Sequence, residues 1–231
     1  MTRRTHAPRP NVAMADAEPG DRRRRRAILG HLADAANLLT LAGLASSTAA
    51  IAFAFNAEYE AAAIGLVLAF FFDVIDGPVA KRLHGRTADD RAFGANLDSL
   101  ADMVAAGGAL GIVLLSYGEF GAAYVPGAIA LSAAAAMRLS YFNVHGLDEG
   151  SASYTGLPTD LAIIAFVAVM LLDKPLPRDV FQPLIYGAAV ALAALMVSPL
   201  RISKLTGRWY YALTALAFLM AAAHAWLLAG V

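Results

Sequence analysis

Long apolar runs separated by short polar connections occupy most of the chain beyond about residue 37. Most of these runs approach the roughly 20 residues that an α-helix needs to cross about 30 Å of hydrocarbon, and the shorter ones can extend into their flanks. The pattern predicts an all-α integral membrane protein, a polytopic helical bundle with seven spans. The spans cover approximately residues 38–55, 61–80, 93–117, 121–143, 157–172, 180–200 and 209–230.

The first 36 residues differ from the rest in their composition. Residues 1–21 contain proline and arginine without an apolar run, which predicts a disordered basic tail. In residues 22–36, a run of arginines precedes apolar residues at helical spacing, such as Ile28 and Leu32. This pattern fits an interfacial amphipathic helix on an anionic membrane surface. It also fits a solvated arginine run that only sets topology. We expect the interfacial helix, followed by a membrane domain over residues 37–231.

The composition excludes several classes of protein. Of the 231 residues, 59% are hydrophobic and 16% charged, the mean hydropathy is +0.58, and cysteine is absent. A water-soluble domain normally carries about a quarter charged residues, so an ordinary soluble globule is excluded. The lack of cysteine excludes a disulfide scaffold, a thiolate zinc site and a thiol nucleophile. A metal site built from carboxylates stays possible.

The basic residues predict how the spans are oriented. The chain has 18 basic and 18 acidic residues. If the N-terminus is cytoplasmic, all the basic residues except Lys174 and Arg178 fall on the cytoplasmic side of the predicted spans. This is the positive-inside pattern of membrane proteins. We therefore expect a multi-pass protein of the cell membrane with a cytoplasmic N-terminus, and the odd number of spans places the C-terminus outside.

Four aspartates interrupt the second and third predicted spans. Asp73 and Asp76 are three residues apart, and Asp98 and Asp102 are four apart, so each pair shares one face of its helix. A lone carboxylate near the bilayer centre costs on the order of 3 kcal/mol. The two antiparallel spans place the pairs at similar depth, near the cytoplasmic side, where four carboxylates would repel one another unless cations lay between them. All-oxygen ligation suits Mg²⁺ or Mn²⁺, and two such ions can act as a clamp in phosphoryl displacement.

The aspartates could also serve a role without a bound metal. They could pair with Lys81 or Arg82, or they could carry protons or ions in an ion-coupled transporter. Transporters commonly contain inverted repeats and interrupted helices, whereas the second half of this chain does not repeat the aspartate pattern. We therefore prefer the metal centre.

The residues around the aspartates resemble the signature of the CDP-alcohol phosphatidyltransferases, D-x2-D-G-x2-A-R followed by G-x3-D-x3-D. The chain reads DVIDGPVAK over residues 73–81 and GANLDSLAD over residues 94–102, which match seven of the eight fixed positions. Lys81 stands where the signature has arginine, and Arg82 follows it.

Shorter stretches extend this resemblance along the chain. NLLT at residues 37–40 resembles the N-x-x-T element of the family, whose six-helix core would cover roughly residues 37–200 and leave one extra C-terminal span. Pro78 is more typical of bacterial phosphatidylcholine synthases. Three stretches are similar to bacterial phosphatidylserine synthases: MRLSYFN at 137–143, YTGLP at 154–158, and LMVS at 195–198 followed by Arg201.

The resemblance implies an integral-membrane transferase that moves a phosphatidyl group from CDP-diacylglycerol to the hydroxyl of a small alcohol and releases CMP. L-Serine is the favoured acceptor, and choline is the alternative. The resemblance also implies two bound Mg²⁺ or Mn²⁺ ions and a homodimer in membrane lipid, without a nucleic-acid partner. It assigns the metals to Asp73, Asp76, Asp98 and Asp102, with Asp102 also acting as the general base.

The residues expected to bind CDP lie in the first three spans and at their cytoplasmic ends. A glycine would leave room for the nucleotide beside a helix, and a basic side chain would contact the diphosphate. The alternatives are helix capping for Asn37, helix packing for the glycines and topological anchoring for the basic residues. The expected CDP-binding residues are Asn37, Thr40, Asp73, Gly77, Lys81, Arg82, Thr87 and Gly94.

Arg138 is the one cation in its apolar span. A guanidinium group recognises a carboxylate well, so we expect Arg138 to bind the acceptor if the acceptor is an amino acid. The alternative is that Arg138 extends its side chain to the cytoplasmic interface.

Overall fold

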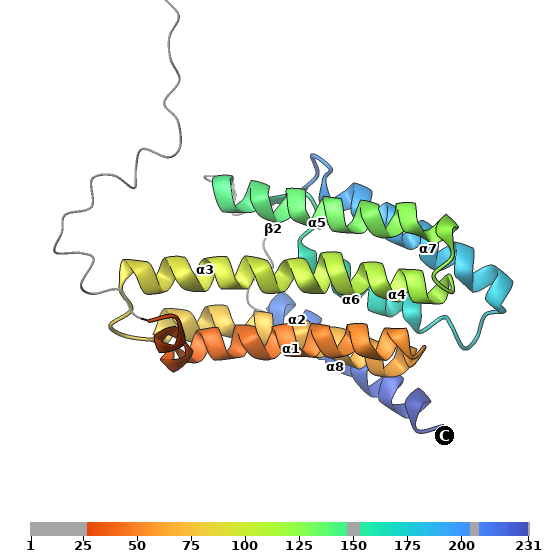
Figure 1. Cartoon of the computed structure of the whole chain (residues 1–231), viewed down its shortest axis with the longest axis horizontal. Helices are drawn as coiled ribbons and strands as arrows, with labels where there is room; N and C mark the ends of the chain where they lie inside the picture. Colours follow the sequence, from red (N-terminus) through yellow and green to blue (C-terminus); the bar gives the residue numbers. More distant parts are fainter. Residues whose placement is uncertain (1–26, 147–152, 204–207, 231) are drawn as a thin grey trace, which may run out of the picture.

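The computed structural model of the protein describes residues 27–146, 153–203 and 208–230, and the expected disordered tail at residues 1–21 lies outside them. The described chain forms a bundle of helices with one small sheet of two strands (Figure 1). In chain order, the helices of the bundle are α1 (Ala35–Phe55), α2 (Tyr59–Arg82), α3 (Ala88–Asp102), η4 (Met103–Ala109), α4 (Leu110–Tyr117), α5 (Val125–His145), α6 (Thr159–Met170), α7 (Arg178–Met196) and α8 (Arg208–Leu228).

Six of the seven predicted spans form a helix or a continuous helical rod long enough to cross a membrane, and the fifth forms the shorter helix α6. The third span is a rod of 30 residues, Ala88–Tyr117, in which α3, η4 and α4 follow one another without a break. Within the described residues, six helices or rods are long and apolar enough to cross a membrane. The prediction of a polytopic all-α membrane protein is therefore confirmed.

The fifth predicted span is shorter in the structure than in the sequence pattern. The apolar run at residues 157–172 forms α6, a helix of only 12 residues that begins directly after Pro158. A helix of this length rises about 18 Å, less than the hydrocarbon core of about 30 Å. Ala162, Phe166 and Val167 have no exposed surface. The apolar character of this run therefore reflects packing of α6 inside the bundle. It does not reflect a helix that crosses the whole membrane.

The segment expected to form an interfacial helix, residues 22–36, is interrupted in the structure. Its first five residues lie outside the described residues, and Ile28–Ala33 form a short 3-10 helix, η3. The extended residue Asp34 follows, and its carboxylate accepts a hydrogen bond of 3.0 Å from the backbone N–H of Ala36. Asp34 is therefore the N-cap of α1, and η3 is separate from the membrane helix.

Close packing of α1 against α2 positions the aspartates of α2. A Cβ atom at Gly65 of α2 would lie 2.9 Å from the carbonyl oxygen of Ser46 and 3.0 Å from the Cβ of Ala50, both on α1. Small residues allow helices to approach this closely in a membrane. The approach brings the Thr40 hydroxyl of α1 to the carboxylate of Asp76 on α2, to which it donates a hydrogen bond.

The long third rod changes its helical geometry directly after Asp102. The segment η4 is π-helical, and π-helical turns are frequent at functional sites. This segment packs against α5, where the hydroxyl of Ser132 donates a hydrogen bond of 3.0 Å to the carbonyl oxygen of Gly107. A Cβ at Gly111 would be 3.6 Å from the Cβ of Ala128 on α5. Small residues thus hold α5 close to the part of the rod that follows the aspartates.

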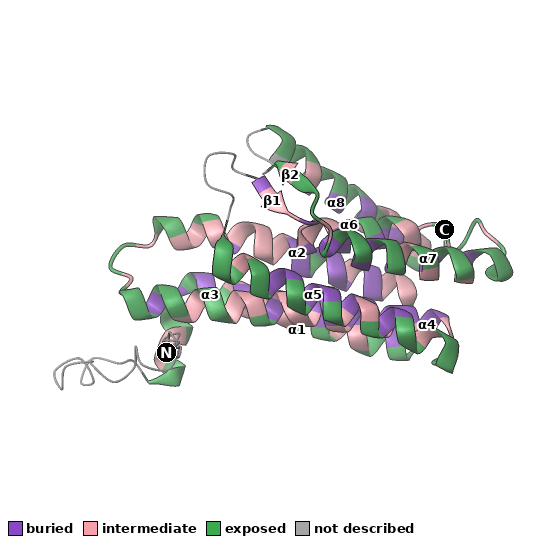
Figure 2. Cartoon of the chain, turned by 90° about the horizontal axis from the view of Figure 1, so that it is seen from above, coloured by how far each residue is buried: buried purple, intermediate pink, exposed green. Residues whose placement is uncertain are grey.

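The hydrophobic core runs through the middle of the bundle. Figure 2 shows buried residues on the inward faces of the helices and exposed residues along the outer faces. Phe70, Phe166 and Phe181 are among the largest fully buried side chains. By contrast, Ile129 on α5 and Leu219 on α8 are exposed although they are large and apolar. Such residues on long apolar helices are suited to contact with lipid.

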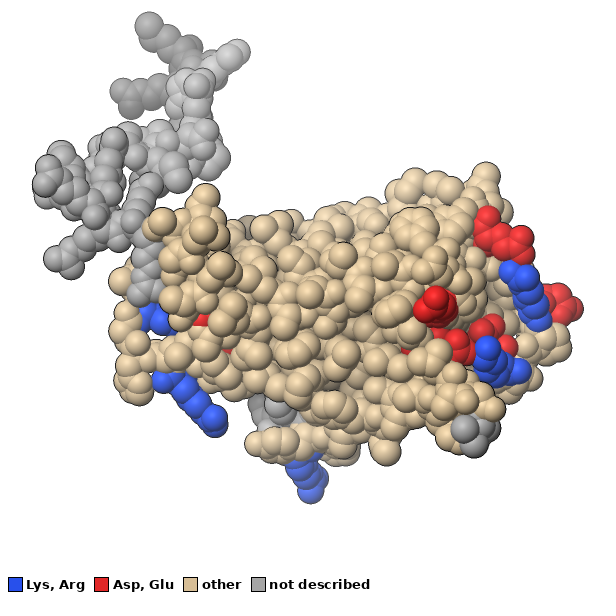
Figure 3. Space-filling model, turned by 60° about the horizontal axis from the view of Figure 1, so that its bottom comes forward, with Lys and Arg blue, Asp and Glu red and all other residues tan. Residues whose placement is uncertain are grey.

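Charged side chains lie mostly toward the ends of the helices. On the face drawn in Figure 3, a wide uncharged surface covers the middle, and most of the exposed acidic side chains gather near one end. At the end of the bundle where α1 finishes, Lys174 lies 2.8 Å from Glu60, and Arg178 lies 2.6 Å from Glu119. The ion pair with Glu60 raises the pKa of Lys174. Lys174 and Arg178, the two basic residues expected on the outer side, are therefore each paired with a nearby glutamate.

The small sheet joins two stretches that are far apart in the sequence. Strand β1 (Ser153–Thr155) pairs with β2 (Arg201–Ser203) in antiparallel register, with Tyr154 opposite Ile202. These strands overlap two of the stretches that resemble phosphatidylserine synthases, at Tyr154 and Thr155 and at Arg201. Their pairing holds the chain between α5 and α6 against the chain between α7 and α8.

Gly156 makes the turn from β1 toward α6. Its φ is +76°, a value that glycine adopts without strain. Its backbone N–H donates a hydrogen bond of 2.7 Å to the carbonyl oxygen of Leu200. A Cβ at this position would lie 2.2 Å from the carbonyl oxygen of Met196. Both the backbone conformation and the lack of space therefore require glycine.

Replacement of Gly156 by alanine should destabilise the protein. The added methyl group clashes with backbone and strains a positive φ, so the free energy of unfolding should fall by about 1–3 kcal/mol. The thermal unfolding midpoint in detergent measures this loss. Gly187→Ala on α7 is the matched control, because a Cβ there meets nothing within 4 Å. An equal loss of stability in the two variants would contradict this account.

Candidate functional site

Helices α2 and α3 bring the signature aspartates together. Asp73, Asp76 and Asp98 can each offer one carboxylate oxygen such that all three atoms lie within 4.8 Å of one another. Asp76 is buried, and the other two are partly buried. The spacing within each helix and the packing of both helices against α1 produce this grouping.

A second group of three carboxylates shares Asp73 with the first. It consists of Asp73, Asp102 and Asp160, whose ligand oxygens also lie within 4.8 Å of one another. The Thr159 hydroxyl lies 3.4 Å from Asp102 Oδ2 and 3.4 Å from Asp160 Oδ1. The sequence pattern did not single out Asp160. The signal in the sequence was an acidic residue in the apolar run at residues 157–172, but acidic residues are common in the first turn of any helix.

The donor set of this cluster fits divalent metal ions. It consists of carboxylate oxygens alone, which are the ligands that Mg²⁺ and Mn²⁺ prefer. Within the described residues, the ion pairs closer than 4.0 Å involve carboxylates other than these five. Lys81 and Arg82 are exposed at the end of α2. The structure therefore does not support the alternative in which these basic residues neutralise the aspartates.

A cavity of about 540 Å³ opens beside Asp76 and Asp98, and it contains most of the expected CDP-binding residues. A Cβ at Gly77 would meet nothing within 4 Å, so this face of α2 is open to the cavity. Asp73 lies outside the cavity lining and borders a small space between Asp76 and Asp102. The expected residues that line the cavity are Asn37, Thr40, Gly77, Lys81 and Gly94.

The described residues that line this cavity do not include Thr87 and Arg82. Thr87 is the N-cap of α3, where it forms a capping box: its side chain accepts a hydrogen bond from the backbone N–H of Asp90, and its backbone N–H donates to the Asp90 carboxylate. This role accounts for Thr87 without a ligand. Arg82 is exposed at the end of α2, while the preceding residue Lys81 faces the cavity.

Arg86 lines the cavity although the sequence pattern did not select it. Its Nε atom lies 2.7 Å from Asp34 Oδ2, and the pair connects the start of α1 to the loop between α2 and α3. A Cβ at Gly94 would lie 2.7 Å from Arg86 Nη2 and 3.1 Å from Asn37 Oδ1. Gly94 thus gives space to two polar side chains at the cavity wall.

Asn37 and Thr40 lie one turn apart on the buried face of α1. Because Asp34 caps α1, the capping alternative for Asn37 is wrong. The Asn37 amide donates a hydrogen bond of 3.0 Å to the carbonyl oxygen of His31, and its own oxygen has no hydrogen-bond partner among the described residues. Thr40 contacts Asp76 through its hydroxyl, so it orients a carboxylate as well as lining the cavity.

Arg138 is buried and does not extend to the membrane interface. The residue is only 6% exposed, which contradicts the interfacial alternative. Its Cζ atom lies 5.5 Å from the ring centroid of Phe142 and 5.6 Å from that of Tyr154. In the described chain, its Nε atom has no hydrogen-bond partner. A buried guanidinium with an unused donor is suited to bind an anionic group.

Comparison with known proteins identifies the family. The family described as CDP-alcohol phosphatidyltransferase matches residues 33–200. The chain belongs to this family. The match contains α1 to α7 and ends before α8, so α8 is the extra C-terminal helix that the sequence predicts. The family is one of transferases, so the aspartates are not those of an ion-coupled transporter.

Two relatives support this result. The archaetidylserine synthase of Methanothermobacter thermautotrophicus is 30% identical over 174 residues, which are 74% of this chain and 70% of the relative. The CDP-diacylglycerol–serine O-phosphatidyltransferase of Helicobacter pylori strain J99 is 31% identical over 173 residues, which are 71% of this chain and 70% of the relative.

A large side chain at Gly77 should obstruct the cavity without disturbing the fold. We expect Gly77→Leu to reduce kcat/KM for the CDP-alcohol donor by at least about tenfold, because the leucine would occupy the cavity expected to hold the nucleotide. Radiolabelled CMP release in detergent measures this effect. Gly187→Leu is the control, since that position is equally open but lies on α7. Normal donor kinetics in Gly77→Leu would show that the nucleotide binds elsewhere.

Proposed function

We propose that the protein is a CDP-diacylglycerol–serine O-phosphatidyltransferase, which forms phosphatidylserine and CMP. The observation that carries this proposal is the convergence of the signature carboxylates beside a cavity of about 540 Å³. The names of the two relatives and the burial of Arg138 favour serine as the acceptor. Choline carries no carboxylate, so a buried guanidinium would have no partner on it.

Asp73, Asp76, Asp98 and Asp102 are proposed to hold two divalent ions, Mg²⁺ or Mn²⁺. When bound, such ions neutralise a diphosphate and stabilise the charge that develops during phosphoryl transfer. Asn37, Gly77, Lys81 and Gly94 are proposed to hold the CDP group in the cavity beside the ions. Arg86 is proposed as a further contact to the nucleotide or its phosphates, because it lines the same cavity.

Asp102 is proposed as the general base. Its carboxylate accepts the proton of the serine hydroxyl, and the serine oxygen forms a bond to the phosphorus that carries the diacylglycerol. The bond from this phosphorus to the oxygen of CMP breaks, and CMP leaves with the electron pair. Asp102 is suited to this role because it lies in the carboxylate group that includes Asp160, away from the lining of the nucleotide cavity.

The proposed orientation places the nucleotide cavity on the cytoplasmic side. Lys81, Arg86 and Arg91 line the cavity at the end of the bundle where α1 begins. A concentration of basic residues indicates the cytoplasmic side of a membrane protein, and CDP and serine are both water-borne. Helix α8 ends toward the opposite end of the bundle, where α1 finishes (Figure 1), so we propose that the C-terminus lies outside. We also propose that the protein is a homodimer, as the resemblance to the family implies.

Metal binding should stabilise the protein through Asp73, because this residue belongs to both groups of carboxylates. A ligand that binds only the folded state raises its stability, so Mn²⁺ should raise the thermal midpoint of the wild type. Asp73→Asn should lose this increase. Asp89→Asn, an exposed residue in the first turn of α3, should keep it. A full Mn²⁺-dependent increase in Asp73→Asn would argue against a metal at this residue.

Asp102→Asn should abolish phosphatidyl transfer, with a loss of at least about 100-fold in kcat, because the base is missing. The purified variant should stay folded, and Asp89→Asn again serves as the control.

Purified wild-type protein should be assayed with CDP-diacylglycerol and separately with serine, choline, inositol phosphate and glycerol phosphate. The proposal expects a product with serine. A product with choline alone would replace serine transfer by phosphatidylcholine synthesis.

A further inference from the structure

Asp160 connects the carboxylate cluster to a second cavity. One of its oxygens lies within 4.8 Å of ligand oxygens of Asp73 and Asp102. Asp160 also lines a cavity of about 100 Å³ formed by α2, the small sheet, α6 and α8, together with Tyr154 and Thr214. This cavity shares no lining residue with the larger cavity proposed for the nucleotide. Asp160 is therefore placed where a second substrate could approach the cluster from another direction.

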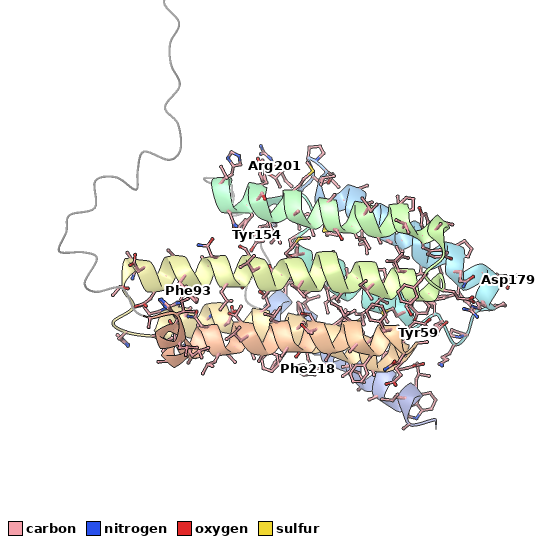
Figure 4. The ribbon with its side chains drawn as sticks, in the orientation of Figure 1. Tyr59, Phe93, Tyr154, Asp179, Arg201 and Phe218 are labelled. Atoms are coloured by element: carbon pink, nitrogen blue, oxygen red, sulfur yellow. The ribbon has the colours of Figure 1, made fainter. Side chains whose placement is uncertain are left out.

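Arg138 lies beside Tyr154, one of the residues that line this cavity, but it does not line the cavity itself. Its guanidinium is 5.6 Å from the centroid of the Tyr154 ring, and Tyr154 lies on the side of α5 that faces the bundle (Figure 4). The structure shows no ion pair within 4.0 Å between Arg138 and a described carboxylate. The buried Arg138 and the partly buried Asp160 thus both lie near Tyr154 without forming an ion pair with each other.

A purely structural role for Asp160 would be stabilisation of the α6 N-terminus. Acidic residues in the first turn interact favourably with the helix dipole. Asp179 holds the same position in α7, as the second helical residue after an N-cap proline, and it is exposed at the end of the bundle. The helix terminus alone therefore does not require a carboxylate in contact with the cluster. Asp179 also supplies a matched control.

We propose that Asp160 binds the amino group of the acceptor and, together with Arg138, makes the site selective for an amino acid. This inference rests on the proposed transfer to serine and adds a residue outside the signature. In L-serine the hydroxyl and the ammonium are on adjacent carbons, and the carboxylate is on the carbon that carries the ammonium. Because oxygens of Asp102 and Asp160 lie within 4.8 Å, one molecule can present its hydroxyl to Asp102 and its ammonium to Asp160.

The carboxylate of the acceptor then meets Arg138. Charge-assisted hydrogen bonds of this kind give both orientation and selectivity. An alcohol that lacks the ammonium leaves Asp160 without a cationic partner, and an alcohol that lacks the carboxylate leaves Arg138 without an anionic one. Each unsatisfied charge disfavours the wrong acceptor.

The test compares acceptors in wild-type protein and Asp160→Asn in detergent with CDP-diacylglycerol and Mn²⁺. The acceptors are L-serine, 3-hydroxypropionate, which lacks the amino group, and ethanolamine, which lacks the carboxylate. The ratio of kcat/KM for serine to that for 3-hydroxypropionate should fall by about 10- to 100-fold in Asp160→Asn, because one charge-assisted contact is lost. The Mn²⁺ affinity, measured by electron paramagnetic resonance, should match that of the wild type.

Two controls separate recognition from a structural role. Asp179→Asn should keep the wild-type ratio. Asp160→Glu retains the charge and should keep most of the preference for serine over 3-hydroxypropionate, which tests the inference even if Asp160→Asn does not fold. An unchanged ratio in Asp160→Asn would overturn the inference. A weaker Mn²⁺ affinity with an unchanged ratio would instead make Asp160 a metal ligand and would also overturn it.

The same assay distinguishes this inference from the proposed function. If the wild type transfers to serine and Asp160→Asn keeps its preference, only the inference fails. If the wild type transfers only to an alcohol without an amino group, both fail.

Discussion

Negative charge enclosed in an apolar bundle is the constraint on which this structure depends. Asp73, Asp76, Asp98 and Asp102 lie in helices that are otherwise suited to lipid, and carboxylates within a few ångströms repel strongly where the dielectric constant is low. The surrounding fold fixes them in place: α1 approaches α2 closely enough for Thr40 to hydrogen-bond to Asp76. A site of this kind is complete only with cations, so stability and metal binding are expected to be coupled.

The sequence was sufficient for the parts of the site that lie within one helix or between consecutive helices. Asp73 and Asp76 share a face because they are three residues apart, and the antiparallel neighbour supplies Asp98 at similar depth. The position of Gly77 could also be predicted, because it is adjacent to Asp76 in the signature and borders the same cavity. The hydrophobicity pattern also predicted the apolar helices in their order along the chain, because each of them is a long run of apolar residues.

The sequence was insufficient where the site depends on contacts between distant segments. Asp160 reaches the cluster because the short helix α6 packs inside the bundle and not as a full span. Arg86 lines the cavity because it forms an ion pair with Asp34, from which it is separated in the sequence by α1 and α2. Thr87 has a side chain that could bind a ligand, yet its role in the structure is to cap α3 in a capping box with Asp90. A hydrophobicity pattern contains no information on these pairings.

We propose that the aspartates of α2 and α3 hold two divalent ions beside the CDP cavity. An anomalous difference map at the manganese absorption edge, from crystals grown with Mn²⁺ and CDP-diacylglycerol, tests it most directly. We predict two peaks within the group formed by Asp73, Asp76, Asp98 and Asp102, with the diphosphate next to them. A map with no peak in this group, while the CDP group occupies the cavity, would contradict the account.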